Sequence, residues 1–100
     1  MRYDDIPKLA TWKNDTSILR KSAPGSILTK LDAEIDNYHK AFVAMTKRNL
    51  LTDIGYLIRD WEKIHYATVS NHPNVVGLKE VIARKIKELS GAICLIATEA

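Results

Sequence analysis

Large apolar residues recur three and four positions apart between residues 51 and 64, where the sequence reads LTDIGYLIRDWEKI. This spacing is typical of one face of an α-helix. The stripe consists of Leu51, Ile54, Leu57, Ile58, Trp61 and Ile64. At 1.5 Å of rise per residue it is about 20 Å long. It therefore predicts a helix over about 50–65 that forms the centre of a small helical domain.

A second apolar stripe lies upstream and predicts a helix over about 26–45. Ser22 or Ser26 can cap its start, and Pro24 suits a first helical turn. The stripe consists of Leu28, Leu31, Ile35, Tyr38 and Phe42. Because the link to the next helix is short, we expect the two helices to be antiparallel neighbours.

A third helix is predicted over about 75–97, with Asn74 as its cap, and Asn49 is a good cap for the helix before it. The charged residues expected on its outward face are Lys79, Glu80, Arg84, Lys85 and Lys87. The pattern therefore favours an all-α fold, a three-helix antiparallel up-down-up bundle with a short N-terminal arm, residues 1–22.

The arm has no sustained period and reads as one or two turns of helix. Tyr3 and Trp12 are too apolar to be left in water, so we expect the arm to pack on the bundle.

The composition changes this picture little. The chain has 100 residues, of which 46% are hydrophobic and 27% charged, which indicates one globular domain, residues 1–100, and excludes a disordered chain. A single cysteine excludes an internal disulfide. No apolar run is long enough for a membrane span, and no signal peptide is visible. We expect a soluble protein that is cytoplasmic where it is made, or one delivered by a secretion route that needs no signal peptide.

The net charge of +3 comes from the first half of the chain. Part of this half forms a basic patch, which consists of Lys8, Lys13, Arg20, Lys21 and Lys30, with Asp15 as the one acid among them. Such a patch favours solubility or an acidic partner, and nucleic-acid binding is a third hypothesis for the function. Against it, a helix-turn-helix needs a turn of three or four residues and a polar recognition helix, whereas the helix over 50–65 offers two cations, Arg59 and Lys63.

The last predicted turns are apolar on every side, because residues 92–97 read AICLIA. A helix that is apolar all round should be buried, and three helices with an arm offer it little cover. We therefore expect Ile93, Leu95 and Ile96 to meet a protein partner, a second copy or a missing C-terminal domain.

Two spacings, LxxLDxxIxxY over 28–38 and LxxIxxLIxxW over 51–61, resemble a helical accessory segment of bacterial secreted effectors and polymorphic toxins. The family often carries a basic residue just before the first motif and just after the tryptophan, and Lys21 and Lys63 lie near those places. The resemblance covers about residues 21–90. It implies a non-catalytic interaction module that precedes a cysteine-protease-like or deamidase-like domain.

Under this resemblance Cys94 is the candidate nucleophile of a papain-like cysteine hydrolase, completed by residues outside this chain. The three histidines, His39, His65 and His72, all precede Cys94, whereas a papain-like site needs a histidine after it. Flanked by Ile93 and Leu95, Cys94 reads instead as a small buried hydrophobe.

Other chemistry has little support in the sequence. No CxxC or HExxH metal motif and no glycine-rich phosphate loop is present, and we expect no metal and no cofactor. Asp32, Glu34 and Asp36 lie two positions apart, which separates their carboxylates on a helix, and they read as a solvated face.

Overall fold

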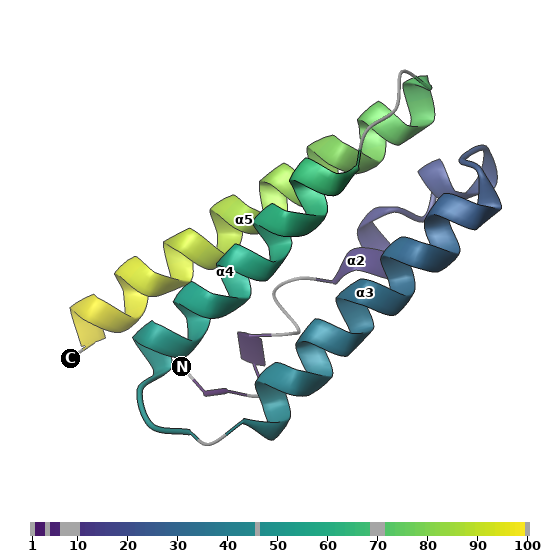
Figure 1. Cartoon of the computed structure of the whole chain (residues 1–100). Helices are drawn as coiled ribbons and strands as arrows, with labels where there is room; N and C mark the ends of the chain where they lie inside the picture. Colours follow the sequence, from purple (N-terminus) through teal and green to yellow (C-terminus); the bar gives the residue numbers. More distant parts are fainter. Residues whose placement is uncertain (1, 4, 7–10, 46, 69–71, 100) are drawn as a thin grey trace.

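In the computed structural model, the described residues are 2–3, 5–6, 11–45, 47–68 and 72–99, and all regular structure within them is helical. The all-α prediction is confirmed. The long helices are α3 (Gly25–Ala44), α4 (Leu50–Ala67) and α5 (Pro73–Glu99). Successive long helices run in opposite directions, and α4 and α5 lie side by side (Figure 1).

The start of α4 follows the prediction. The side-chain oxygen of Asn49 accepts a hydrogen bond from the backbone N–H of Thr52 at 3.2 Å, so Asn49 is the N-cap. The predicted serine caps of α3 are wrong. Pro24 occupies the N-cap position, where no side chain caps the helix.

The start of α5 also differs from the expectation. Pro73 is the first helical residue, because its fixed φ suits a first turn. Asn74 is therefore inside the helix, and its Nδ2 donates to the backbone oxygen of Ser22 at 2.9 Å. The expected range of 75–97 is two residues short at each end.

The core is centred on α4, which packs against both α3 and α5. Trp61 is fully buried in the middle of this helix. The other fully or almost fully buried side chains of the three long helices include Ile35, Phe42, Ile54, Leu57, Ile64, Leu78, Ile82 and Leu89. The apolar spacing of the sequence therefore marks the face of each helix that lies in the core.

The N-terminal arm packs on these helices, as expected. It contains the short helix α2 (Trp12–Asp15) and the 3-10 turn η1 (Leu19–Lys21). Trp12 is buried, and its ring meets that of Trp61 edge to face with 6.2 Å between centroids. Leu19 of η1 lies against α5, where a Cβ added to Gly77 would lie 2.9 Å from Leu19 Cδ2. The glycine therefore allows η1 to approach α5 closely.

Candidate functional site

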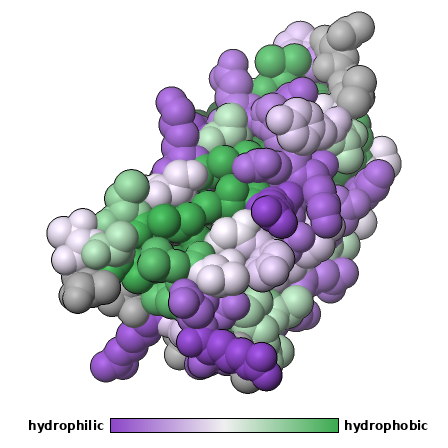
Figure 2. Space-filling view, turned by 60° about the vertical axis from the view of Figure 1, so that its left-hand side comes forward, coloured by the Kyte–Doolittle hydropathy of each residue, from purple (hydrophilic) through white to green (hydrophobic). Residues whose placement is uncertain are grey.

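The C-terminal turns of α5 carry the predicted partner-binding residues. Leu95 is 48% exposed, and Ile93 and Ile96 are partly buried at the edge of the core. The arm meets α5 at Gly77 and at Lys85, both before these turns, and α4 is the long helix that packs along α5. Figure 2 shows hydrophobic residues gathered at the surface toward the end of the molecule where α5 ends. The apolar tail is therefore only partly covered.

Cys94 lies in these turns and is exposed, so its interpretation as a buried hydrophobe is wrong. Among the described residues, no hydrogen bond or ion pair involves its thiol. His39 accepts a hydrogen bond from the indole of Trp61, and His65 packs against the ring of Tyr66. Those two imidazoles therefore have other partners, and the hydrolase hypothesis stays a prediction about residues outside the chain.

The third histidine, His72, directly precedes α5. Cys94 is 22 positions after His72, and at about 1.5 Å of rise per residue the two are roughly 30 Å apart along the helix. No described histidine is therefore brought beside the thiol.

Asp32 is the centre of a polar cluster and is not part of a solvated face. Both of its oxygens accept from the guanidinium of Arg20, at 2.9 and 2.6 Å, and Trp12 Nε1 donates to Oδ1 at 2.7 Å. The hydrogen bonds from Arg20 are the main cause that lowers the pKa of Asp32. Thr16, which is fully buried, accepts from Arg20 Nε at 2.9 Å. The cluster joins the arm to α3.

This cluster changes the interpretation of the basic patch. Arg20 is paired with Asp32, and Lys13 lies 3.6 Å from Asp36, so two of the five cations face acids of α3. Lys21 and Lys30 are exposed. Lys8 lies outside the described residues. The expected patch is therefore partly neutralised within the chain.

Lys85 is buried, although the sequence places it among the outward-facing charges of the third helix. Its Nζ contacts the carboxylate of Asp15 in the arm and lies 3.1 Å from Glu88 Oε2. The sequence does contain a signal for this position. Leu78, Ile82, Lys85 and Leu89 follow a spacing of four, three and four, which is the spacing of one helical face.

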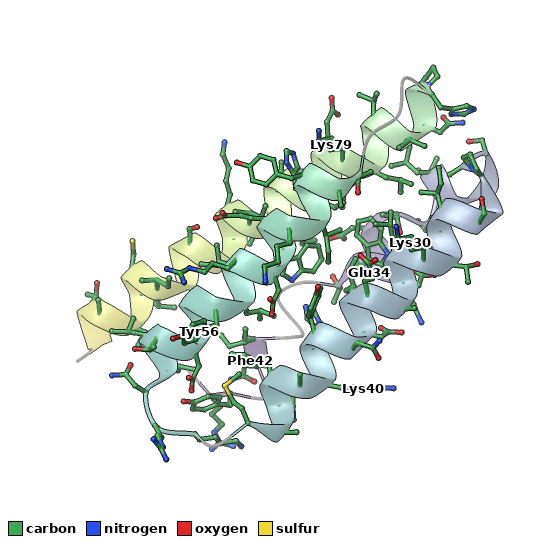
Figure 3. The ribbon with its side chains drawn as sticks, viewed as in Figure 1. Lys30, Glu34, Lys40, Phe42, Tyr56 and Lys79 are labelled. Atoms are coloured by element: carbon green, nitrogen blue, oxygen red, sulfur yellow. The ribbon has the colours of Figure 1, made fainter. Side chains whose placement is uncertain are left out.

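An apolar groove of about 210 Å³ lies between α3, the end of α4 and the start of α5. Ile27, Leu31 and Ile64 form part of its walls, with Lys30 and Glu34 of α3 at the rim (Figure 3). Pockets for drug-sized ligands are usually about 300–1,000 Å³. The groove is therefore too small for such a ligand.

In the part of the chain that the structure describes, no helix has the length and hydropathy to cross a membrane, and no group of three or more His, Cys, Asp or Glu residues is placed to hold a metal ion.

The comparisons with known proteins found no match. No family model matches the chain, and neither a curated protein nor a solved structure is significantly similar to it.

Proposed function

We propose that the chain is a non-catalytic helical interaction module, built as a three-helix antiparallel bundle with a docked arm, which binds a protein partner through the last turns of α5. The observation that carries this proposal is the half-exposed side chain of Leu95 between Ile93 and Ile96, which are partly buried. Exposed apolar patches that are contiguous mark interaction surfaces in soluble domains.

The physical argument rests on the helix itself. The end of α5 is apolar on more than one face, and burying such side chains is worth about 25 cal/mol per Å² of apolar surface removed from water. The core and α4 cover only part of that surface. A partner that covers Leu95 and the exposed parts of its neighbours would supply the missing burial.

The resemblance to accessory segments of bacterial effectors and toxins extends the proposal to a partner. In that setting the partner is the catalytic domain that the segment precedes, and α5 leads directly into it. The sequence that follows Ala100 in the natural reading frame tests this extension. A downstream domain with a catalytic histidine would support it, and a stop codon directly after Ala100 would contradict it.

The interaction surface itself is tested with a hydrophobic dye and light scattering. We expect the chain to bind anilinonaphthalene sulfonate while it retains its helical circular dichroism. Substitution Leu95→Lys should reduce the dye fluorescence, because it places a charge in the apolar patch. Thr98→Lys, on the same helix and at an exposed residue, is the matched control and should leave the fluorescence unchanged.

A monodisperse monomer that binds no dye at any concentration would contradict the proposal. Equal changes of fluorescence in both variants would also contradict it, because the dye, which is an anion, would then respond to the added positive charge and not to the patch.

A further inference from the structure

A second surface, on the outward side of α4, is made of different residues. The exposed residues there are Thr52, Tyr56, Arg59, Lys63, Tyr66 and Ala67. Tyr56 and Tyr66 are 56% and 74% exposed and are the two large aromatic side chains on this face. Tyrosine and arginine are also the residue types enriched among those that dominate protein interfaces. The composition of this face therefore indicates binding.

A hollow lies in this face and has the geometry of a helix-packing site. It is lined by Thr52, Gly55, Tyr56 and Arg59, which occupy positions i, i+3, i+4 and i+7 of α4. Four residues of one helix in this arrangement form the hole that accepts a side chain of a facing helix. Its volume is about 170 Å³, which is small beside the roughly 300–1,000 Å³ of ligand pockets and suits one side chain. Tyr56 lies in the first half of α4 (Figure 3).

Gly55 is what keeps the hollow open. Apart from its chain neighbours and the nearby backbone of α4, a Cβ built on Gly55 would meet no atom of the described residues within 4 Å, so no other described segment packs into the space of the missing side chain. A glycine inside a helix destabilises it relative to alanine. A facing helix that approaches α4 here would use the space that this glycine leaves.

The charges of the face define the chemistry of that helix. The exposed charged residues of α4 are both cations, Arg59 and Lys63, and two more exposed cations, Lys47 and Arg48, directly precede the helix. Lys63 Nζ lies 4.0 Å from Asp60 Oδ1, but its side chain is still 73% exposed. The three acids of α4 are only partly exposed, and Asp53 accepts a hydrogen bond from Tyr3 at 2.6 Å. Arg59 borders the hollow, with its guanidinium carbon 5.8 Å from the ring centroid of Tyr56. A partner with acidic side chains therefore complements the face.

We propose that the outward face of α4 binds an amphipathic helix of a partner protein. That helix places one large apolar side chain in the hollow over Gly55 and acidic side chains against Arg59 and Lys63. The inference does not rest on the proposed role of the α5 tail, because it uses none of the same residues.

Two other occupants fit the face less well. A second copy of the chain would present the same exposed cations, Arg59 and Lys63, and like charges that meet across an interface are unfavourable. A nucleic acid would pair its phosphates with Arg59 and Lys63, but it offers no apolar side chain for the hollow, and two cations supply few phosphate contacts.

The test uses two fluorescein-labelled helical peptides of about 20 residues, long enough to form helix in water. Both carry leucines along one face, flanked by glutamate in one peptide and by lysine in the other. We expect fluorescence anisotropy to show binding of the glutamate peptide only. Gly55→Ala, which places a methyl group in the floor of the hollow, should weaken this binding by about tenfold or more. Arg59→Glu with Lys63→Glu should abolish it.

Gly91→Ala is the matched control, because Gly91 is also a helical glycine with no atom within 4 Å of an added Cβ, but it lies on α5. Both alanine variants should raise the midpoint of thermal unfolding, since alanine favours helix. Only Gly55→Ala should lose peptide binding. Loss of binding in a more stable variant is not the result of misfolding.

Three results would overturn the proposal. The first is no difference between the two peptides up to about 1 mM, and the second is equal binding by wild type and Gly55→Ala. The third is a different occupant: dimers in light scattering that Gly55→Ala removes would identify a second copy. Tight, salt-dependent binding of a labelled DNA duplex by the wild type, lost in the double charge reversal, would identify a nucleic acid instead.

Discussion

The indole Nε1–H of Trp61 in α4 donates a hydrogen bond to Nε2 of His39 in α3, with 3.1 Å between the two nitrogens. Because the indole can only donate, Nε2 of His39 must accept, and the imidazole is then neutral with its proton on Nδ1. The two rings are also in contact, with 5.6 Å between centroids. A titratable side chain therefore satisfies the one polar atom of the Trp61 side chain, which is fully buried.

This pair predicts that the fold loses stability in mild acid. Burial lowers the pKa of His39 below its usual 6.5, against the opposing effect of Asp36. As the pH falls through about 6.5 the unfolded chain takes up a proton at this residue and the folded chain does not, so stability present above that pH is lost. The cations nearest to His39 are Lys13 of the arm, which is paired with Asp36, and Lys40 on α3, and each lines a surface hollow together with His39.

Urea unfolding at about pH 7 and pH 5 measures this loss. His39→Gln should reduce the loss, because the amide oxygen can still accept from Trp61 but does not titrate. Burial also lowers the pKa of His65, so His65→Gln serves as the comparison and should have a smaller effect, because His65 is less deeply buried. An unchanged pH dependence in His39→Gln would contradict the assignment.

Trp61→Ala should lower the free energy of unfolding by about 3–5 kcal/mol, because it leaves a cavity in a fully buried site. Trp61→Phe removes less volume but leaves His39 Nε2 without its donor, and it should cost less than the alanine variant. Chemical denaturation measures both. An unchanged midpoint for Trp61→Ala would show that α4 is not the centre of the core.

The burial of Lys85 predicts that two kinds of variant lose different amounts of unfolding free energy. Asp15→Asn with Glu88→Gln leaves a buried ammonium without an anion, which should cost about 3–5 kcal/mol. We expect the lower end, because the side chains of Asp15 and Glu88 are 34% and 48% exposed. Lys85→Met removes the buried charge and should be close to neutral. Urea unfolding of the two variants tests the inequality, and equal losses would contradict it.

The phenol of Tyr3 should lose its proton at a higher pH than an ordinary tyrosine. Burial and the hydrogen bond to the carboxylate of Asp53 raise its pKa from 10.0 to about 12. The folded chain therefore keeps a proton that the unfolded chain loses, so this stability is complete below about pH 10 and disappears as the pH rises toward 12. In a pH titration of the native protein, the tyrosinate absorbance should contain one component that appears only near pH 12. Tyr3→Phe should remove it, and an identical titration curve would contradict the contact.

Cys94 should react with iodoacetamide in the native state, because its thiol is exposed. The expected rate is close to that of the denatured chain, measured by mass spectrometry. Labelling that needs denaturant would show that the end of α5 is covered in solution.

The sequence by itself determined the helices. Apolar spacing is local, since residues three and four apart share a helix face whatever surrounds them. It therefore predicted the core face of α4, and the same local logic identified Asn49, whose side chain bonds three residues ahead. It also predicted Ile93, Leu95 and Ile96 as an apolar surface, but not how far each is exposed.

Only the tertiary structure decided which charges are buried and paired. Trp12 and Asp32 are 20 residues apart, Tyr3 and Asp53 are 50 apart, and Asp15 meets Lys85 from the opposite end of the chain. No local pattern encodes such pairs, because a charged residue reads as solvated until another segment brings an opposite charge to it. The hollow over Gly55 depends on both kinds of information. Its four lining residues are neighbours on one helix, but the hollow stays open only because α3, α5 and the arm pack elsewhere on α4. The chain therefore specifies its helices through short-range periodicity, and its polar contacts through the packing of distant segments.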